Sequence, residues 1–267
     1  MASGERIFVQ AIRHYCADRG IAVDVRSGGW LIAMRRGPKR HFAFGYDIGL
    51  NSAIAHRLAN DKSATAEALA LADVPCVPHR LFLNPRLGKD VVGAAWREAM
   101  VGLLQNHPHG VVVKPNEGTS GRSVFKVTTE AELDHAASEV FSMSTGLVIS
   151  PYIAIEEEVR VVLLDDVPQV VYSKQRGSDW RHNLDAGAKP VLLADGELRA
   201  ACVKLASDAA RAIGIAFASI DVVHADGKWK VLEINSGVMM EALGKLHPEL
   251  VQATYDAALD RVFGGSR

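Results

Sequence analysis

The sequence predicts an α+β fold that is built on antiparallel sheets. Predicted helices and strands are interspersed along the chain without a repeated strand–helix–strand alternation, which argues against a doubly wound parallel sheet. Neighbouring strands are joined by short turns, most clearly 217–225 and 228–236 across Asp226-Gly227, which is a strong hairpin signal. The 267 residues are enough for one large domain or two small ones.

The first third of the chain is expected to combine helices with short strands. Apolar residues recur at a helical period in 5–18, and Gly20 ends that helix. A second helix runs from about Asp61 to Asp73, because Val74 precedes a proline and is disfavoured in the helical region. The remaining elements expected here are strands at 21–25, 30–34 and 41–46 and a helix at 91–105.

The second half alternates more clearly between strands, loops and helices. Residues 110–114 form a buried strand, and Thr129 with Glu132 forms a capping box that opens a helix. The other expected elements are strands at 123–127, 147–153, 159–164, 168–174, 217–225 and 228–236, a polar loop at 175–190, a helix at 197–213 closed by Gly214, and a last helix that begins near Pro248.

The composition excludes several classes of protein. Thirty basic residues face 31 acidic ones, so the basic excess of a nucleic-acid or anionic-membrane binder is absent from the sequence. No apolar run reaches the ~18–20 residues that span a bilayer, and charged residues interrupt the first 20 positions, which argues against a signal peptide. Cys16, Cys76 and Cys202 lie far apart, which predicts reduced thiols and a cytoplasmic protein.

Two acidic residues interrupt the apolar strands of the late hairpin. Glu233 and Asn235 share one face of their strand, because side chains alternate. Asp221 joins that face if the connection has an odd number of loop residues, and a two-residue loop places it on the opposite face. Three oxygen ligands on one face would form a Mg²⁺ site. A salt-bridged pair of acids is the alternative.

A lysine and a glycine-containing loop follow the strand at 110–114. Glycines let backbone N–H groups approach a polyphosphate, and a lysine neutralises its charge. This loop lacks the Walker A spacing, and a surface hairpin loop is the alternative. The residues concerned are Lys114, Gly118, Thr119, Ser120, Gly121 and Ser123.

The polar loop at 175–190 carries several cations beside a strand end. Lys174, Arg176, Arg181 and Asn183 are suited to a phosphoryl group in transfer, whose charge must be neutralised. A solvated basic loop is the alternative.

Together these segments resemble the ATP-grasp family, in particular its ribosomal-protein glutamate ligase, glutathione synthetase, cyanophycin synthetase and D-alanine–D-alanine ligase branch. The resemblance covers nearly all of 61–245 and depends on the ordered set. Its parts are Asp61-Lys62, Val74-Pro75, Val113-Lys114-Pro115 with its loop, Ile149-Ser150-Pro151-Tyr152-Ile153, Glu158-Val159-Arg160-Val161, Lys174, Arg181-x-Asn183, Asp221 and Glu233-Ile234-Asn235.

The resemblance implies a role for each matched position. Lys62 and Lys114 would contact the phosphates of ATP, and the loop at 116–123 would close over them. The other implied roles are adenine recognition by the Pro151 carbonyl and the Ile153 amide, ribose binding by Glu158, contacts with the γ-phosphate and an acyl phosphate by Lys174, Arg181 and Asn183, and binding of two Mg²⁺ ions, for which Mn²⁺ can substitute, by Asp221, Glu233 and Asn235.

The resemblance also implies the ATP-grasp fold, in which two α+β subdomains clasp ATP. It places a shortened N-terminal α/β domain at 1–60 and the ATP-grasp domain at 61–267, with a nucleotide-lid subdomain at about 110–153. Ser150 stands where relatives often have a glutamate, which removes an acceptor for the adenine amino group. Glu156 or Glu157 would replace Glu158 if the alignment slips.

The implied activity is that of an ATP-dependent carboxylate–amine ligase that forms an amide through an acyl phosphate. Its substrates would be small carboxylates and amines or a peptide, with no nucleic-acid or membrane partner, and homo-oligomers are common in the family. The alternatives are a peptide- or protein-modifying ligase, including a macrocyclase, a small-molecule kinase, and a nucleotide-binding subunit without catalysis.

Overall fold

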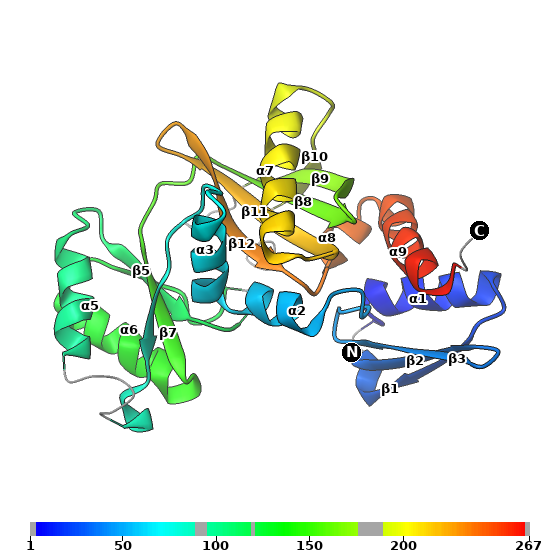
Figure 1. Ribbon diagram of the computed structural model, residues 1–267, viewed down its shortest axis with the longest axis horizontal. Coiled ribbons are helices and arrows are strands. Elements are labelled where there is room, and N and C mark those ends of the chain that lie inside the picture. The colour runs from blue at the N-terminus through cyan, green and yellow to red at the C-terminus, as the bar shows by residue number, and fades with distance from the viewer. Residues whose placement is uncertain (1–3, 89–94, 119–120, 176–188, 265–267) are drawn as a thin grey trace.

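The computed structural model describes residues 4–88, 95–118, 121–175 and 189–264. Three antiparallel sheets follow one another along the long axis of the molecule (Figure 1). Their strand orders are β1-β2-β3, β10-β9-β8-β11-β12 and β4-β7-β5-β6. The expected α+β class with antiparallel sheets is therefore confirmed.

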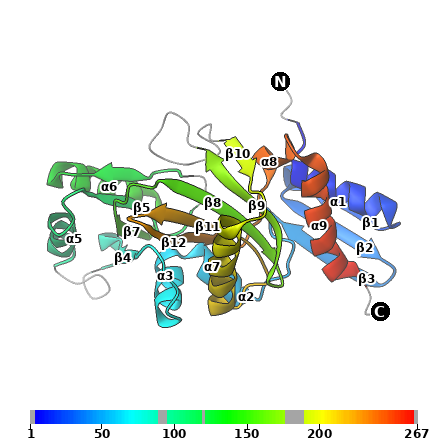
Figure 2. The ribbon, with the colours of Figure 1, turned by 90° about the horizontal axis from the view of Figure 1, so that it is seen from above.

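The three-stranded sheet is a meander near the N-terminus. Helix α1 covers it, and the last helix, α9, packs beside α1 (Figure 2). Phe8 and Tyr15 of α1 share one hydrophobic core with Tyr255 and Phe263 of α9. The elements are α1 (Ile7–Asp18), β1 (Ala22–Arg26), β2 (Leu31–Arg36), β3 (Lys39–Phe44), α8 (Glu241–Gly244) and α9 (Pro248–Phe263).

The five-stranded sheet forms the centre of the molecule. Val159 and Val161 of β8 face one way and pack in a core with α7, while Arg160 between them faces the other way. The elements are α2 (Ala53–Asn60), α3 (Lys62–Leu71), β8 (Glu157–Leu164), β9 (Val167–Gln175), β10 (Lys189–Leu192), α7 (Glu197–Ile213), β11 (Phe217–Ala225) and β12 (Lys228–Asn235).

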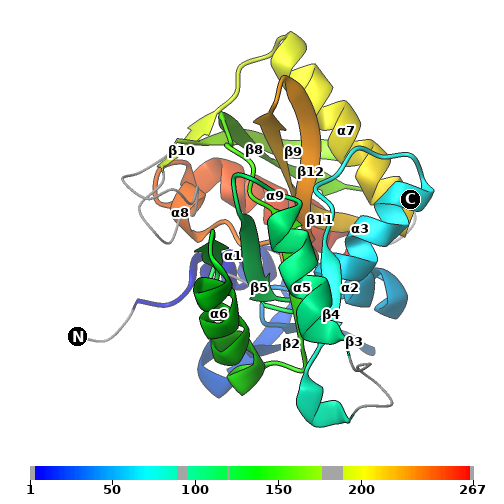
Figure 3. The same cartoon turned by 90° about the vertical axis from the view of Figure 1, so that its left-hand side faces the viewer.

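The four-stranded sheet has its own core beneath two helices, α5 and α6, which Figure 3 shows in front. Thr129 and Glu132 make the expected capping box at the start of α6. The elements are β4 (Arg80–Leu83), α5 (Trp96–Gln105), β5 (Val111–Pro115), β6 (Phe125–Val127), α6 (Glu130–Met143) and β7 (Gly146–Pro151).

Helices α2 and α8 and strands β4 and β10 were not expected from the sequence. Helix α2 was missed because its buried positions, Ala55 and Ala59, are small and give a weak apolar stripe. Strands β4 and β10 have only four residues each, and β10 contains Pro190 at the sheet edge. Gln175 ends β9 and Lys189 begins β10, so both ends of the segment expected as a loop at 175–190 are strand residues.

The division at residue 60 stays a prediction. The core that holds α1 also contains residues of α9 and, from the central sheet, Tyr172 and Phe217. The N-terminal segment therefore buries its apolar face against the central sheet and the late part of the chain.

Candidate nucleotide and metal site

One large cavity, of about 1230 Å³, lies among the three sheets. Most of the expected site residues line it, although they come from segments more than 170 positions apart. Those that line it are Lys62, Lys114, Gly118, Gly121, Ser123, Pro151, Ile153, Glu158, Lys174, Glu233 and Asn235. The structure thus brings together side chains that the sequence places on different elements.

A β-bulge decides which face Asp221 occupies. The turn at Asp226-Gly227 has two residues, since Ala225 pairs with Lys228, and this count alone would separate Asp221 from Glu233. The register shifts between Asp221 and Val222, so that Asp221 lies directly opposite Glu233. One extra residue on β12, Leu232, therefore brings the two carboxylates to one face of the sheet.

Four charged side chains form a buried cluster on this face. Arg160 Nε and Nη2 each donate to a different carboxylate oxygen of Asp221, both at 2.7 Å. Lys174 Nζ donates to Asp221 Oδ2 at 2.7 Å and also to Glu158. Since all four residues are at most 9% exposed, each charge depends on its partners inside the cluster.

Burial and pairing shift the pKa values of Asp221 and Glu158 in opposite directions. Burial alone would raise the pKa of Asp221, but the charges of Arg160 and Lys174 outweigh it and hold that pKa below its ordinary value. Burial raises the pKa of Glu158 to about 7, against the opposing charge of Lys174. Asp221 is therefore ionised at neutral pH, whereas Glu158 titrates near it.

Glu233 and Asn235 project from β12 into the cavity. Asn235 Nδ2 donates to Glu233 Oε1 at 3.3 Å, and both side chains are partly exposed. Among the described residues, no three His, Cys, Asp or Glu side chains form a metal-binding group. A metal site here would consequently need the amide oxygen of Asn235 or oxygens from a ligand.

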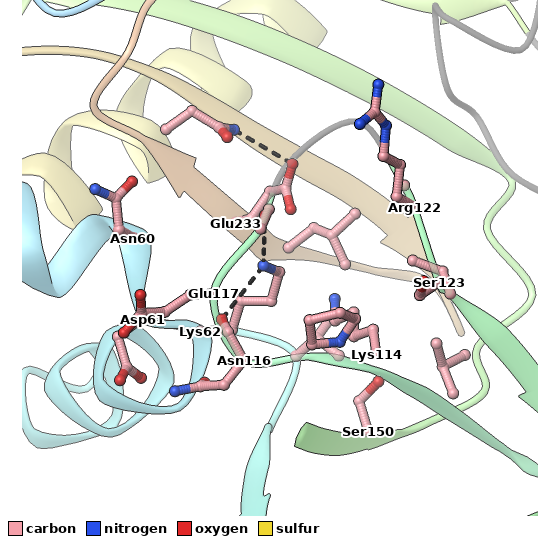
Figure 4. Close-up of a pocket in the computed structure, with 18 of the residues that line it drawn as sticks. Asn60, Asp61, Lys62, Lys114, Asn116, Glu117, Arg122, Ser123, Ser150 and Glu233 are labelled. Atoms are coloured by element: carbon pink, nitrogen blue, oxygen red, sulfur yellow. Dashed lines mark hydrogen bonds between the residues drawn. The ribbon is translucent and has the colours of Figure 1, made fainter. Parts of the chain in front are cut away.

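Two lysines lie beneath Glu233, as Figure 4 shows. Lys62 Nζ donates to the carbonyl oxygens of Gly118, at 2.8 Å, and Asn116, at 3.4 Å, so it ties α3 to the loop after β5. Burial lowers the pKa of Lys114 to about 8, with Lys62 adding to the shift and Glu233 opposing it. Burial also lowers the pKa of Lys62.

The expected adenine end lies on β7. Ser150 is buried and lines the cavity together with Pro151 and Ile153. Ser150 lies opposite Val112 in the β5–β7 ladder, two positions from Lys114, which Figure 4 shows nearby. Thr119, Ser120, Arg181 and Asn183 lie outside the described residues.

Two polar residues of the cavity received no role from the sequence. Arg160 was visible in the Glu-Val-Arg-Val segment, but its bond to Asp221 depends on strand pairing between positions 61 residues apart. Ser219, 1% exposed, pairs in register with Asn235, and its hydroxyl has no hydrogen-bond partner within the described ranges. The sequence did contain a signal for Ser219, because this serine stands in an apolar strand two positions before Asp221, a candidate metal ligand.

The three sheets around one large cavity are consistent with an ATP-grasp fold. The D-alanine–D-alanine ligase from Bacillus anthracis superposes with a TM-score of 0.62 at 20% identity, over 80% of this chain and 69% of that enzyme. A model of the RimK-like ATP-grasp domain family matches residues 84–248, more than half of the chain. The protein belongs to this family, and the resemblance read from the sequence is confirmed.

Two curated relatives carry ligase names. The tetrahydromethanopterin:alpha-L-glutamate ligase of Methanocaldococcus jannaschii is 24% identical over 165 residues, 59% of this chain and 55% of the relative. The ribosomal protein bS6–L-glutamate ligase of Escherichia fergusonii is 24% identical over 232 residues, 84% of this chain and 71% of the relative. The chain thus spans only part, in the first case about half, of the relatives it matches.

Proposed function

We propose that the protein is an ATP-dependent, ADP-forming carboxylate–amine ligase. The observation that carries this proposal is the meeting, in one cavity, of two buried or partly buried lysines, a glycine-containing loop and the Glu233–Asn235 pair. Lysines and backbone N–H groups neutralise phosphates, whereas carboxylate and amide oxygens suit a hard divalent cation. Both relatives described above are named as glutamate ligases, which supports the same reaction class.

The reaction has two steps. A carboxylate oxygen of the first substrate attacks the γ-phosphorus of ATP, the bond to the β,γ-bridging oxygen breaks, and ADP leaves. The nitrogen of the amine then attacks the carbonyl carbon of the acyl phosphate, loses a proton and expels phosphate. The protein contributes position and charge neutralisation, and no covalent enzyme intermediate is required.

The described residues divide between the two ends of ATP. Lys62 and Lys114 would neutralise the phosphates, and Gly118, Gly121 and Ser123 belong to the loop that would cover them. The Pro151 carbonyl and the Ile153 amide would meet the adenine edge at the other end of the cavity. Thr119, Ser120, Arg181 and Asn183 keep the phosphate roles that the family resemblance gives them.

The cluster around Lys174 would change partners when ATP binds. Lys174 now bonds Glu158 and Asp221. A γ-phosphate offers this ammonium a stronger, doubly charged partner. Transfer of Lys174 to the phosphate would release Glu158 for the ribose hydroxyls.

The donor set fits Mg²⁺, and Mn²⁺ as a substitute. Asp221 is buried behind the described cavity lining and accepts three hydrogen bonds, which leaves one of about four lone-pair sites on its carboxylate. It would reach a metal only after Lys174 has moved to the phosphate. Glu233 and the amide oxygen of Asn235 supply further oxygen ligands on the same face. Two bound Mg²⁺ ions would supply charge neutralisation at the triphosphate.

A coupled ADP-release screen tests the proposal. L-glutamate paired with amino acids, dipeptides and other small carboxylates gives the first panel, and mass spectrometry identifies the product. Removal of a preorganised charge partner costs roughly 10²–10³ in rate, so Lys114→Ala is expected to lose that much. Turnover of this variant within a few-fold of the parent would refute the role of Lys114.

The product distinguishes the reaction classes. An amide plus phosphate supports the ligase, a stable phosphoester would show a kinase, and ATP binding without substrate-dependent ADP release would show a binding subunit. Calorimetric titration of Mg²⁺ with ATP present tests the metal ligands. Unchanged Mg²⁺ affinity in both Asp221→Asn and Glu233→Gln would remove that assignment.

The compartment is inferred separately. All three cysteines are free in the structure, in agreement with a reducing compartment. Within the described ranges, no helix combines the length and the apolar composition needed to cross a membrane. The free thiols alone support our proposal of a cytoplasmic protein.

A further inference from the structure

Exposed aromatic side chains form part of the cavity wall. Trp30 is 54% exposed and Phe44 is 67% exposed, and both line the cavity together with Tyr46. The rings of Trp30 and Phe44 lie 6.3 Å apart between centroids. Single exposed aromatics are common, but a contiguous apolar patch on a cavity wall indicates a binding surface. Trp30, Phe44 and Tyr46 are called the aromatic wall below.

The aromatic wall is held in place by its surroundings. The Arg6 guanidinium lies 4.9 Å from the Trp30 ring centroid and 4.6 Å from that of Tyr46, and it donates to the Gly45 carbonyl at 2.9 Å. Gly45 has a φ of +63°, and a Cβ there would lie 2.9 Å from the Trp30 ring. The Trp30 ring therefore packs directly against the backbone of Gly45, which has no side chain. A preorganised ring loses little freedom when a ligand binds to it.

The aromatic wall lies at the end of the cavity where phosphoryl transfer is proposed. A Cβ on Gly237, two positions beyond Asn235, would lie 3.4 Å from Tyr46 Cβ. Ser236 Oγ donates to Asn60 Oδ1 at 3.4 Å, and Figure 4 shows Asn60 beside Glu233. The proposed adenine contacts lie at Pro151, the last residue of β7, and at Ile153 just beyond it. The wall therefore faces the space beyond the phosphates.

The cavity also has room and a polar group for a second substrate. The cavity is larger than the ~300–1,000 Å³ of a typical ligand site, which leaves room for a second substrate beside ATP. The buried Ser219 hydroxyl has no partner in the described part of the chain, and Asn235 lies opposite it. A substrate held there would place its reacting polar group near Ser219 and its side chain on the aromatic wall.

We propose that the aromatic wall selects a substrate with an aromatic or bulky apolar side chain. This inference rests on the proposed ligase function and adds to it a class of substrate. The side chain can belong either to the carboxylate, which supplies the acyl-phosphate carbon, or to the amine, which must reach that carbon. Four simple probes separate these two sources.

The test is calorimetric binding in the presence of Mg²⁺ and a non-hydrolysable ATP analogue. Phenylalaninamide and alaninamide present only an amine, while N-acetylphenylalanine and N-acetylalanine present only a carboxylate. One phenylalanine derivative is expected to bind at least about tenfold more tightly than its alanine counterpart, because it buries an aromatic ring. Equal affinities within both pairs overturn the proposal.

Variants of the aromatic wall provide the second readout. Trp30→Ala and Phe44→Ala are each expected to reduce the preference by about tenfold while affinity for the ATP analogue stays unchanged. Phe42→Ala is the matched control, because Phe42 is 51% exposed on the same strand as Phe44 but lies outside the cavity lining. A preference that survives in both wall variants, or that Phe42→Ala removes equally, overturns the proposal.

The two proposals fail in different ways. Absence of ATP-analogue binding, or of ADP release with every substrate, would count against the ligase function. Normal ATP-analogue binding without any preference for the phenylalanine probes would count only against the aromatic wall. Because the comparison of probes uses the parent protein, it stands even if a wall variant fails to fold.

Discussion

ATP binding is expected to place a proton on Lys114 at alkaline pH. Burial lowers the pKa of Lys114 from 10.5 to about 8 in the nucleotide-free protein. At about pH 8.5, roughly three quarters of this side chain is therefore neutral. A phosphate beside the lysine favours the charged form and returns its pKa toward the ordinary value. ATP binding should then draw a proton from solution.

The size of this uptake follows from the same pKa. About 0.75 proton per ATP is expected at pH 8.5, and almost none from Lys114 at pH 6.5, where the ammonium is already present. Glu158, whose pKa is about 7, is almost fully ionised at pH 8.5 and contributes little there. Calorimetry in two buffers of different ionisation enthalpy, with Mg²⁺ held constant, measures the proton number directly.

An arginine variant is the matched control. Lys114→Arg keeps a cation that stays protonated at pH 8.5, so binding should persist without the uptake assigned to Lys114. Burial also lowers the pKa of Lys62, so Lys62→Arg measures how much of the proton uptake is due to this second lysine. Proton release by the parent protein, or the same uptake in Lys114→Arg, would refute the reasoning.

Three further predictions concern stability, each measured by denaturant unfolding. Asp221→Asn leaves two buried cations undercompensated and should lower the free energy of unfolding by about 3–5 kcal/mol. Glu233→Gln should lower it by about 1 kcal/mol or less. Equal losses of stability in the two variants would contradict the buried cluster. Thr129→Ala removes a helix cap and should cost about 1 kcal/mol, so an unchanged midpoint would argue against the capping box. Gly110→Ala, at a φ of +88° and with a Cβ site 2.4 Å from a β6 carbonyl, should cost about 1–3 kcal/mol. Gly102→Ala, in a helix with open space around it, should instead raise the free energy of unfolding by about 0.5–1 kcal/mol. A Gly102→Ala variant less stable than Gly110→Ala would contradict the geometry.

Local patterns predicted the elements that carry the site. Asp226-Gly227 predicted the hairpin, and Asp61 predicted the start of the helix that presents Lys62, where its side chain accepts from the Ala64 amide. Both signals are strong because a turn and a helix cap need particular residues at particular positions.

Contacts between distant strands were less accessible to the sequence. The bulge at Leu232 has no glycine or proline to mark it, so the face of Asp221 stayed open until the register was known. The bonds from Arg160 and Lys174 to Asp221 join three strands, and local periodicity does not fix which residues of such strands are opposite. The aromatic wall was missed for the same reason, because it meets the cavity only through tertiary packing.

The pairing of α1 with α9 has a consequence for synthesis on the ribosome. Phe8, Ile12 and Tyr15 are made well before their core partners Tyr255, Leu259 and Phe263, which come more than 230 residues later. At a synthesis rate of about 5–20 residues per second, at least ~10 s pass between the synthesis of α1 and that of α9, which covers the apolar side of α1. This core therefore cannot close until α9 has been made, and the apolar side of α1 depends on other contacts during that interval.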